Sequence, residues 1–146
     1  MKWASALAQH SDLEKAFSAA AEQIKAELGS KSPDLLLCFV SPGFASKYNE
    51  IPELAVKNLN PGSFAGCSAG GIIGGGLELE KESAIALSAA TLPDVKVNKF
   101  HIEDKDLPDL DAAPDKWEEA VSVKSSEEPQ FVLLPDPFSF CIDILA

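Results

Sequence analysis

The sequence contains no arginine, and its twelve basic side chains, all lysines, face 23 aspartates and glutamates. The formal net charge is therefore −11 at pH 7. Nucleic-acid affinity comes mainly from basic side chains that neutralise phosphates, so this balance excludes a nucleic-acid-binding domain and disfavours anionic membrane surfaces. Without guanidinium groups, a bound carboxylate or phosphate has to be held by lysines or by backbone N–H groups.

Cysteine and histidine are also scarce. The three cysteines, Cys38, Cys67 and Cys141, form no C-x-x-C pair, and there are only two histidines. This pattern predicts neither a zinc site nor a disulfide framework, and it is typical of a reducing compartment. We therefore expect a cytoplasmic protein with no metal and no cofactor.

Long hydrophobic runs are absent. The longest, Leu35–Val40, has six residues, whereas a membrane-spanning helix needs about 20. The amino terminus has neither a signal peptide nor a transit peptide pattern. At 146 residues, 46% hydrophobic and 24% charged, the composition is that of a globular protein, and we expect residues 1–146 to form a single domain.

The clearest local pattern is an amphipathic helix near the amino terminus. Ser11 and Glu14 have the spacing of a capping box, and Gly29 is suited to end the helix. Between them, apolar residues recur at helical spacing, at Leu13, Ala16, Phe17, Ala20, Ala21, Ile24 and Leu28.

The first half of the chain alternates strands and helices. Lys2–Ala8 is predicted to be a strand, and the continuous apolar run in Asp34–Ser41 indicates a strand covered on both faces. A helix over Ile51–Asn60 and a strand over Ser63–Ser68 follow. Short links between these elements predict a parallel βαβαβ arrangement.

The second half changes character. Ser83–Leu92 and Val95–Ile102 are predicted to form an antiparallel hairpin, followed by a helix over Lys116–Val123 and a strand over Gln130–Leu134. The fold class is therefore α/β, a mixed sheet with a parallel first half and an antiparallel hairpin in the second, with helices packed on the sheet. Because Phe138–Leu145 is apolar, we expect either a longer natural chain or a homodimer to cover it.

Six of the nine glycines lie between Gly66 and Gly76. Such density indicates unusual backbone angles or a close approach to the backbone. Three explanations stay open: a nucleophile elbow at Ser68 with His10 or His101 as base, a nest of N–H groups for an anion, or a tight structural connection. The stretch matches neither the P-loop nor the G-x-G-x-x-G pattern.

Several short motifs together resemble FIST domains ("F-box and intracellular signal transduction"). They are Phe39–Pro42, Gly66–Gly76, Leu92–Val95 and Asp136–Phe140, in that order. The likeness is to the amino-terminal portion of that domain. It implies a sensory module that binds small ligands, amino acids among them, in intracellular signalling proteins, and it brings no established catalytic residue.

These observations combine into one functional hypothesis, a sensory domain without enzymatic activity. The N–H groups of Gly70 and Gly71 would hold a carboxylate, the hydroxyl of Ser68 would add a hydrogen bond, and Asp136 would bind an ammonium group. The full set of predicted ligand-binding residues is Ser41, Gly66, Cys67, Ser68, Gly70, Gly71 and Asp136. Two alternatives remain: a protein-interaction module using the acidic Glu103–Glu119 segment or the apolar tail, and a serine hydrolase using Ser68.

Overall fold

A computed structural model describes residues 1–29 and 31–136, and the chain divides into two units, Met1–Val97 and Asn98–Ala146. The first unit contains all the strands that the structure describes. The second contains one α-helix and short 3-10 turns among its described residues. The expectation of a single domain over residues 1–146 stays a prediction.

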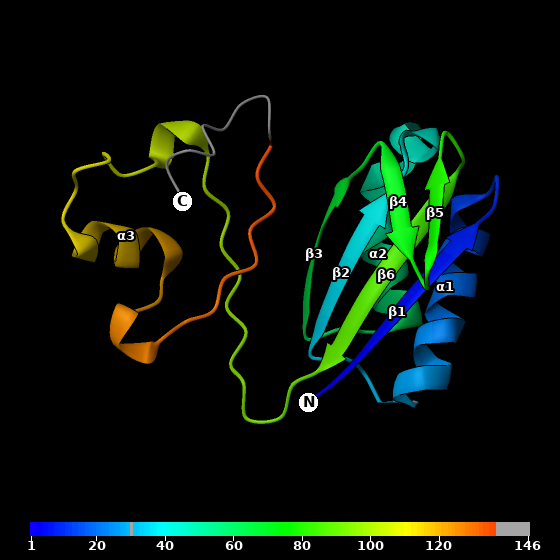
Figure 1. The fold of residues 1–146 in the computed structure, drawn as a ribbon, viewed down its shortest axis with the longest axis horizontal. Coiled ribbons are helices and arrows are strands. Elements are labelled where there is room, and N and C mark those ends of the chain that lie inside the picture. Colours follow the sequence, from blue (N-terminus) through cyan, green and yellow to red (C-terminus); the bar gives the residue numbers. More distant parts are fainter. Residues whose placement is uncertain (30, 137–146) are drawn as a thin grey trace. The chain divides into compact units, whose positions relative to one another are not determined.

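The first unit is built on a four-stranded sheet (Figure 1). Its strands are β1 (Lys2–Gln9), β2 (Leu35–Val40), β3 (Ser63–Ser68) and β6 (Ala84–Thr91), in the order β1-β6-β2-β3. β3 is parallel to β2, whereas β6 is antiparallel to both β1 and β2. The first three strands therefore run in one direction, as predicted, but β6 lies between β1 and β2. The mixed α/β class is confirmed.

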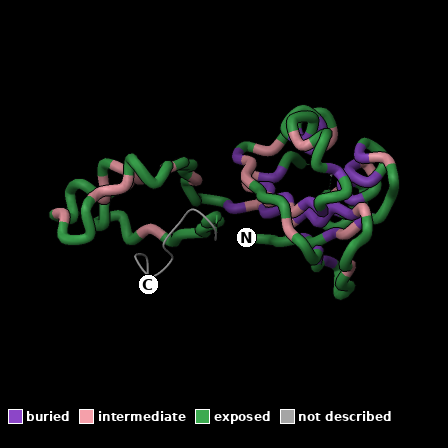
Figure 2. The backbone as a smooth tube through the Cα atoms, turned by 90° about the horizontal axis from the view of Figure 1, so that it is seen from above, coloured by how far each residue is buried: buried purple, intermediate pink, exposed green. Residues whose placement is uncertain are grey.

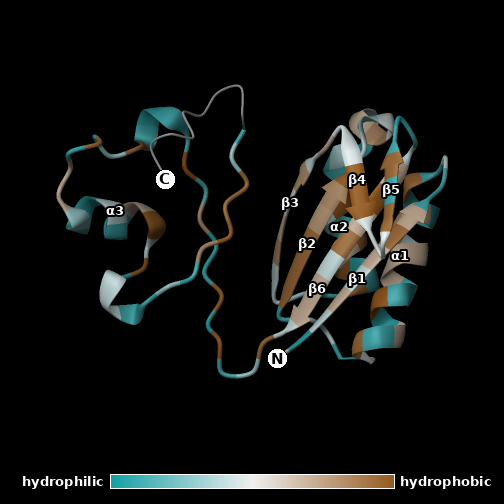
Figure 3. Ribbon diagram, in the orientation of Figure 1, coloured by the Kyte–Doolittle hydropathy of each residue, from teal (hydrophilic) through white to brown (hydrophobic). Residues whose placement is uncertain are grey.

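Both predicted helices of the first unit are present, α1 (Leu13–Leu28) and α2 (Ile51–Asn58). They cover one face of the sheet, and Phe17 of α1 is fully buried in the core that they share with it. β2 is hydrophobic along its whole length (Figure 3), with its even-numbered residues buried and its odd-numbered residues half-buried.

The start of α1 differs from the prediction by one residue. Asp12, not Ser11, is the N-cap, and its side chain accepts a hydrogen bond from the Lys15 backbone N–H at 3.0 Å. This bond lowers the pKa of the Asp12 carboxyl. Gly29 ends the helix with a φ of 85°, as expected for a glycine cap.

The glycine stretch forms a second, two-stranded antiparallel sheet on the opposite face, β4 (Gly71–Gly74) with β5 (Leu77–Glu80) (Figure 1). Gly75 and Gly76 make the turn with φ values of 55° and 78°, which favour glycine in a two-residue hairpin loop. Ile72 is buried against Ala84 and Ala86 of β6. An antiparallel hairpin is therefore present, but the glycine-rich stretch forms it, not the two segments predicted to do so.

The hairpin predicted for Ser83–Leu92 and Val95–Ile102 is wrong in its second strand. Both sides of β6 are already paired, with β1 and with β2, so no edge is left for a returning strand. Val95–Ile102 has no strand structure. Gln130–Leu134 forms no strand either, and it pairs with no described strand. The Phe131 ring instead makes an edge-to-face contact with Phe100, with centroids 6.1 Å apart.

The second unit has little core in its described part. None of residues 98–136 is buried, whereas buried residues fill the first unit (Figure 2). The predicted helix near Lys116 is confirmed as α3 (Pro114–Val121). Phe138–Leu145 lies outside the described residues, and no helix among those described is long and apolar enough to cross a membrane.

Candidate functional site

The carboxyl ends of the parallel strands β2 and β3 meet at one end of the sheet. Val40 pairs with Ser68, and the Ala69 N–H donates to the Val40 carbonyl at 3.0 Å. Six of the seven predicted residues lie in or close to these strand ends. Ser41 follows β2, Gly66, Cys67 and Ser68 end β3, Gly70 lies in the connection, and Gly71 begins β4. Ligands of open α/β sheets collect at such strand ends.

The hydroxyl, N–H and carbonyl groups of Ser41 all take part in hydrogen bonds within the first unit. Ser41 is 3% exposed, and its hydroxyl oxygen accepts a hydrogen bond from the Ala84 N–H at 2.9 Å. Its own N–H donates to the Ala84 carbonyl at 3.0 Å, and its carbonyl accepts from the Tyr48 hydroxyl at 3.1 Å. Ser41 therefore ties the end of β2 to β6 and to the 3-10 helix over Pro42–Glu50.

Two glycines of the stretch are closely packed. A Cβ at Gly66 would lie 2.1 Å from the Cys38 carbonyl oxygen, and a Cβ at Gly74 would lie 3.1 Å from the Ala6 carbonyl oxygen. Backbone atoms cannot move aside as a flexible side chain can, so Gly66 excludes a side chain in this fold, whereas a side chain at Gly74 would require its neighbours to shift by a few tenths of an ångström. With the hairpin turn at Gly75 and Gly76, four of the six glycines have a structural reason.

Gly70 and Gly71 have no such structural reason to be glycine. A Cβ at Gly70 would meet no atom within 4 Å, and a Cβ at Gly71 would meet only the Glu80 Cγ at 3.9 Å. Neither residue has a left-handed φ, and both are exposed. Their main chain is therefore open to an approaching ligand, and the fold alone would tolerate a side chain at either position.

The two described cysteines differ in environment. Cys67 and Ser68 are exposed at the end of β3, whereas Cys38 is buried under the helices. Burial raises the pKa of the Cys38 thiol to about 12, so this group stays protonated and unreactive. Cys67 and Ser68 border the open glycines and are available to a ligand.

The arrangement around Ser68 is not that of a nucleophile elbow. That motif places the serine on a sharp turn between a strand and a helix, but here β4 follows the serine. The His10 ring accepts the Asp12 backbone N–H through Nδ1 at 2.8 Å, and His101 lies in the second unit. Among the described residues, no hydrogen bond joins Ser68 to a base.

Asp136 lies in the second unit and is exposed. It is not placed relative to the open glycines, so its contact with an ammonium group stays a prediction.

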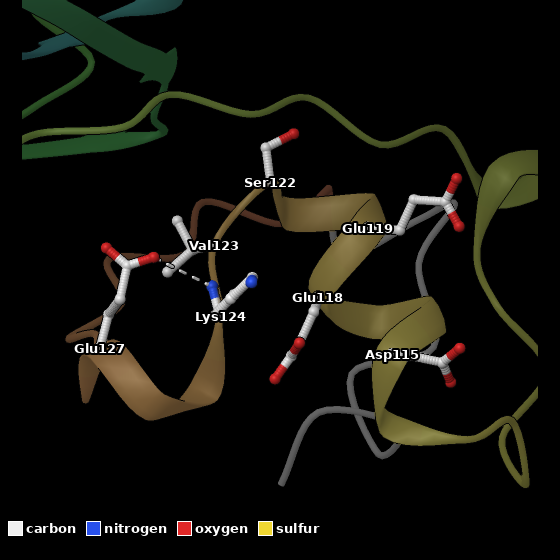
Figure 4. A pocket seen from close by; sticks show the side chains of 7 residues that line it. All are labelled: Asp115, Glu118, Glu119, Ser122, Val123, Lys124 and Glu127. Carbon is white, nitrogen blue, oxygen red and sulfur yellow. Dashed lines mark hydrogen bonds between the residues drawn. The ribbon is translucent and has the colours of Figure 1, made fainter.

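A cavity of about 360 Å³ lies on α3 (Figure 4). Figure 4 shows the carboxylates of Asp115 and Glu119 pointing away from that of Glu118. Glu118 accepts hydrogen bonds from the Ser125 hydroxyl at 2.5 Å and the Ser125 N–H at 2.8 Å, which lower the pKa of its carboxyl. No group of acidic, histidine or cysteine side chains in the described residues has the geometry of a metal site. The cavity is lined by Asp115, Glu118, Glu119, Ser122, Val123, Lys124 and Glu127.

A second cavity, of about 160 Å³, lies at the carboxyl ends of α1 and α2 and includes Lys25, Lys31 and Lys57 in its lining. Lys25 and Lys57 pair with Glu22 and Glu14 at 2.7 and 2.6 Å. None of the seven predicted residues lines either cavity. The candidate site at the glycines is thus an open surface of main chain.

These features define a class: a small mixed α/β domain whose parallel strands end in a glycine-rich connection with exposed backbone. Residues 34–146 match the FIST N domain, and the chain belongs to this family of signalling-associated domains. The match begins after β1 and α1 and includes the whole glycine stretch. No curated protein and no solved structure matches the chain.

Proposed function

We propose that the chain is a small-ligand-binding sensory domain of a signalling protein, and that the main chain of Gly70 and Gly71 recognises the ligand. One observation carries this proposal: Gly70 and Gly71 are exposed glycines for which neither packing nor backbone angle gives a reason. Glycine is the residue that lets a ligand come close to the backbone. Membership of the FIST N domain family agrees with a role in signalling.

The chemistry of the surface favours an amino acid as ligand. Backbone N–H groups bind carboxylates without help from arginine, which this chain lacks. Ser68 is exposed two residues before Gly70, and its hydroxyl would supply a further hydrogen bond. The net charge of −11 favours a ligand that also carries a positive group.

Thermal unfolding in the presence of each common amino acid tests the proposal. At a concentration about 100 times its dissociation constant, a ligand stabilises the folded state by roughly 2.7 kcal/mol, which raises Tm by about 10 °C. Gly70→Ala should abolish this shift, because its Cβ would occupy the approach to the backbone, while the unliganded Tm stays unchanged.

Ile73→Thr is the matched control. Ile73 is 69% exposed in the neighbouring strand β4, so the change alters the local surface and leaves the glycines intact. This variant should keep the full ligand-induced shift. The proposal is wrong if no amino acid stabilises the chain, or if Gly70→Ala responds as the wild type does.

Protein association is the second candidate function. It is favoured by the edge of β3, which has no neighbouring strand in the described part of the chain. Such an edge can bind an extended segment through backbone hydrogen bonds.

A further inference from the structure

The two edges of the four-stranded sheet differ. At β1, the Gln23 side chain of α1 donates to the Leu7 carbonyl at 3.2 Å, and Lys2 donates to the Glu27 carbonyl of the same helix. The α1 helix thus engages the β1 edge. In the part of the chain that the structure describes, β3 pairs with β2 on one side only, and Gly66, Cys67 and Ser68 are exposed.

The backbone groups on the open side of β3 follow from its ladder with β2. The Ser63 N–H donates to the Asp34 carbonyl at 2.9 Å, and the Ala69 N–H donates to the Val40 carbonyl at 3.0 Å. In a parallel pair the residues of one strand alternate between facing the partner and facing away. The N–H and C=O groups of Phe64, Gly66 and Ser68 therefore face the open side.

This edge lacks the features that usually prevent association. Natural edge strands are protected by charged side chains, prolines or bulges. The sequence of β3, Ser-Phe-Ala-Gly-Cys-Ser, has no charge and no proline, in a chain with a net charge of −11. A second copy can approach this strand without bringing like charges together in the ladder.

We propose that β3 pairs antiparallel with β3 of a second copy of this chain, across a two-fold axis at Gly66. In this register Gly66 lies opposite its own copy and Phe64 lies opposite Ser68, so all the outward N–H and C=O groups of these three residues are paired. The contact is self-complementary, as a two-fold dimer requires. It ends at Ser68 and leaves Gly70 and Gly71 free, so it does not rest on the proposed ligand.

The side chains fit the same register. Ala65 of one copy faces Cys67 of the other, and both are small. They lie on the same face of the sheet as Leu37 and Phe39, away from the helices α1 and α2. The half-buried row that begins at Leu37 and Ala65 continues across the axis into the second copy.

A disulfide tests the register. In antiparallel sheets, residues of a pair without mutual hydrogen bonds have Cα atoms about 4.5 Å apart, within the range that a disulfide spans. Ala65→Cys should therefore link to Cys67 of the second copy under mild oxidation and give a reducible dimer. The experiment uses the full chain with Cys141→Ser, so that Cys38, Cys67 and the introduced cysteine are the remaining thiols.

Glu78→Cys in the same background is the control, because Glu78 is exposed on β5, away from the β3 edge. It should remain monomeric on a non-reducing gel. Adding Cys67→Ser to Ala65→Cys should abolish the β3 link between the copies. Equal rates of crosslinking for Ala65→Cys and Glu78→Cys would overturn the proposal.

Sedimentation equilibrium tests association without a covalent link. The wild type should dimerise reversibly, and Ser68→Pro should weaken the dimer at least about tenfold, because proline removes one outward N–H. Ser68→Ala retains that N–H and should dimerise as the wild type does. A wild type that stays monomeric at every concentration, or a folded Ser68→Pro chain that dimerises equally well, would contradict the pairing. If Ser68→Pro does not fold, the disulfide experiment decides.

Discussion

Gly66→Ala gives the sharpest test of how the glycines are divided between packing and recognition. The added Cβ would lie 2.1 Å from the Cys38 carbonyl oxygen and 3.0 Å from its carbon. These are backbone atoms of the neighbouring strand, so β2 and β3 must separate locally. Overpacking costs about 1–3 kcal/mol and each lost ladder hydrogen bond about 1 kcal/mol, so we expect a loss of about 3 kcal/mol.

Urea unfolding followed by circular dichroism measures this loss directly. Since roughly 4–8 °C of Tm corresponds to each kcal/mol in a unit of about 100 residues, a loss of about 3 kcal/mol should lower Tm by about 12–24 °C. Gly70→Ala is the matched control, because its Cβ meets no atom within 4 Å, and its stability should change by less than about 0.5 kcal/mol. Equal stabilities of the two variants would refute this division of the glycines.

Three further predictions concern the fold around the site. Ser41→Ala leaves the buried Ala84 N–H without its side-chain acceptor, so urea unfolding should show a loss of about 1–3 kcal/mol; a loss within experimental error would contradict the role of Ser41 as a tie. Asp12→Ala should destabilise α1 at neutral pH. The lowered pKa of Asp12 means that its stabilisation is present above the unfolded-state pKa and disappears as the pH falls through the folded-state value, so wild type and variant should converge in acid, once the pH lies below the folded-state pKa. A difference that persists there would argue against the carboxylate cap. In a Cys141→Ser chain, a thiol reagent should label Cys67 rapidly and Cys38 only upon unfolding, because Cys67 is exposed and the Cys38 thiol is buried; equal rates would contradict this placement.

Helical periodicity was enough to predict α1, because this helix buries one continuous apolar stripe against the sheet. The start of α1 was misplaced by one residue. Ser11 and Asp12 are both good N-cap residues, and only the bond from the Lys15 N–H distinguishes them.

The position of β6 could have been read from its composition. Ala84–Thr91 is apolar on both faces, and six of its eight residues are buried, which is typical of a central strand. It was instead predicted to pair with Val95–Ile102, whereas β1 and β2 occupy both of its sides. The Gly75–Gly76 pair between Ile72–Ile73 and the alternating Leu77–Glu80 segment was the signal for the real hairpin, β4–β5.

The separate roles of the glycines could not be predicted from the sequence. Gly66 and Gly70 stand in the same stretch with similar neighbours. Their difference depends on the Cys38 carbonyl, which pairing of β2 with β3 brings against Gly66 and leaves distant from Gly70. The contacts that require glycine at one position and not at another form only when the strands pair.

The amide resonances of Gly70 and Gly71 provide the most direct measurement of backbone recognition. In nitrogen-15 spectra recorded while a stabilising amino acid is added, these two signals should move strongly, whereas those of Gly75 and Gly76 in the hairpin turn should stay in place. If such a ligand binds and the Gly70 and Gly71 signals do not move, the main chain at the end of β3 does not hold the carboxylate.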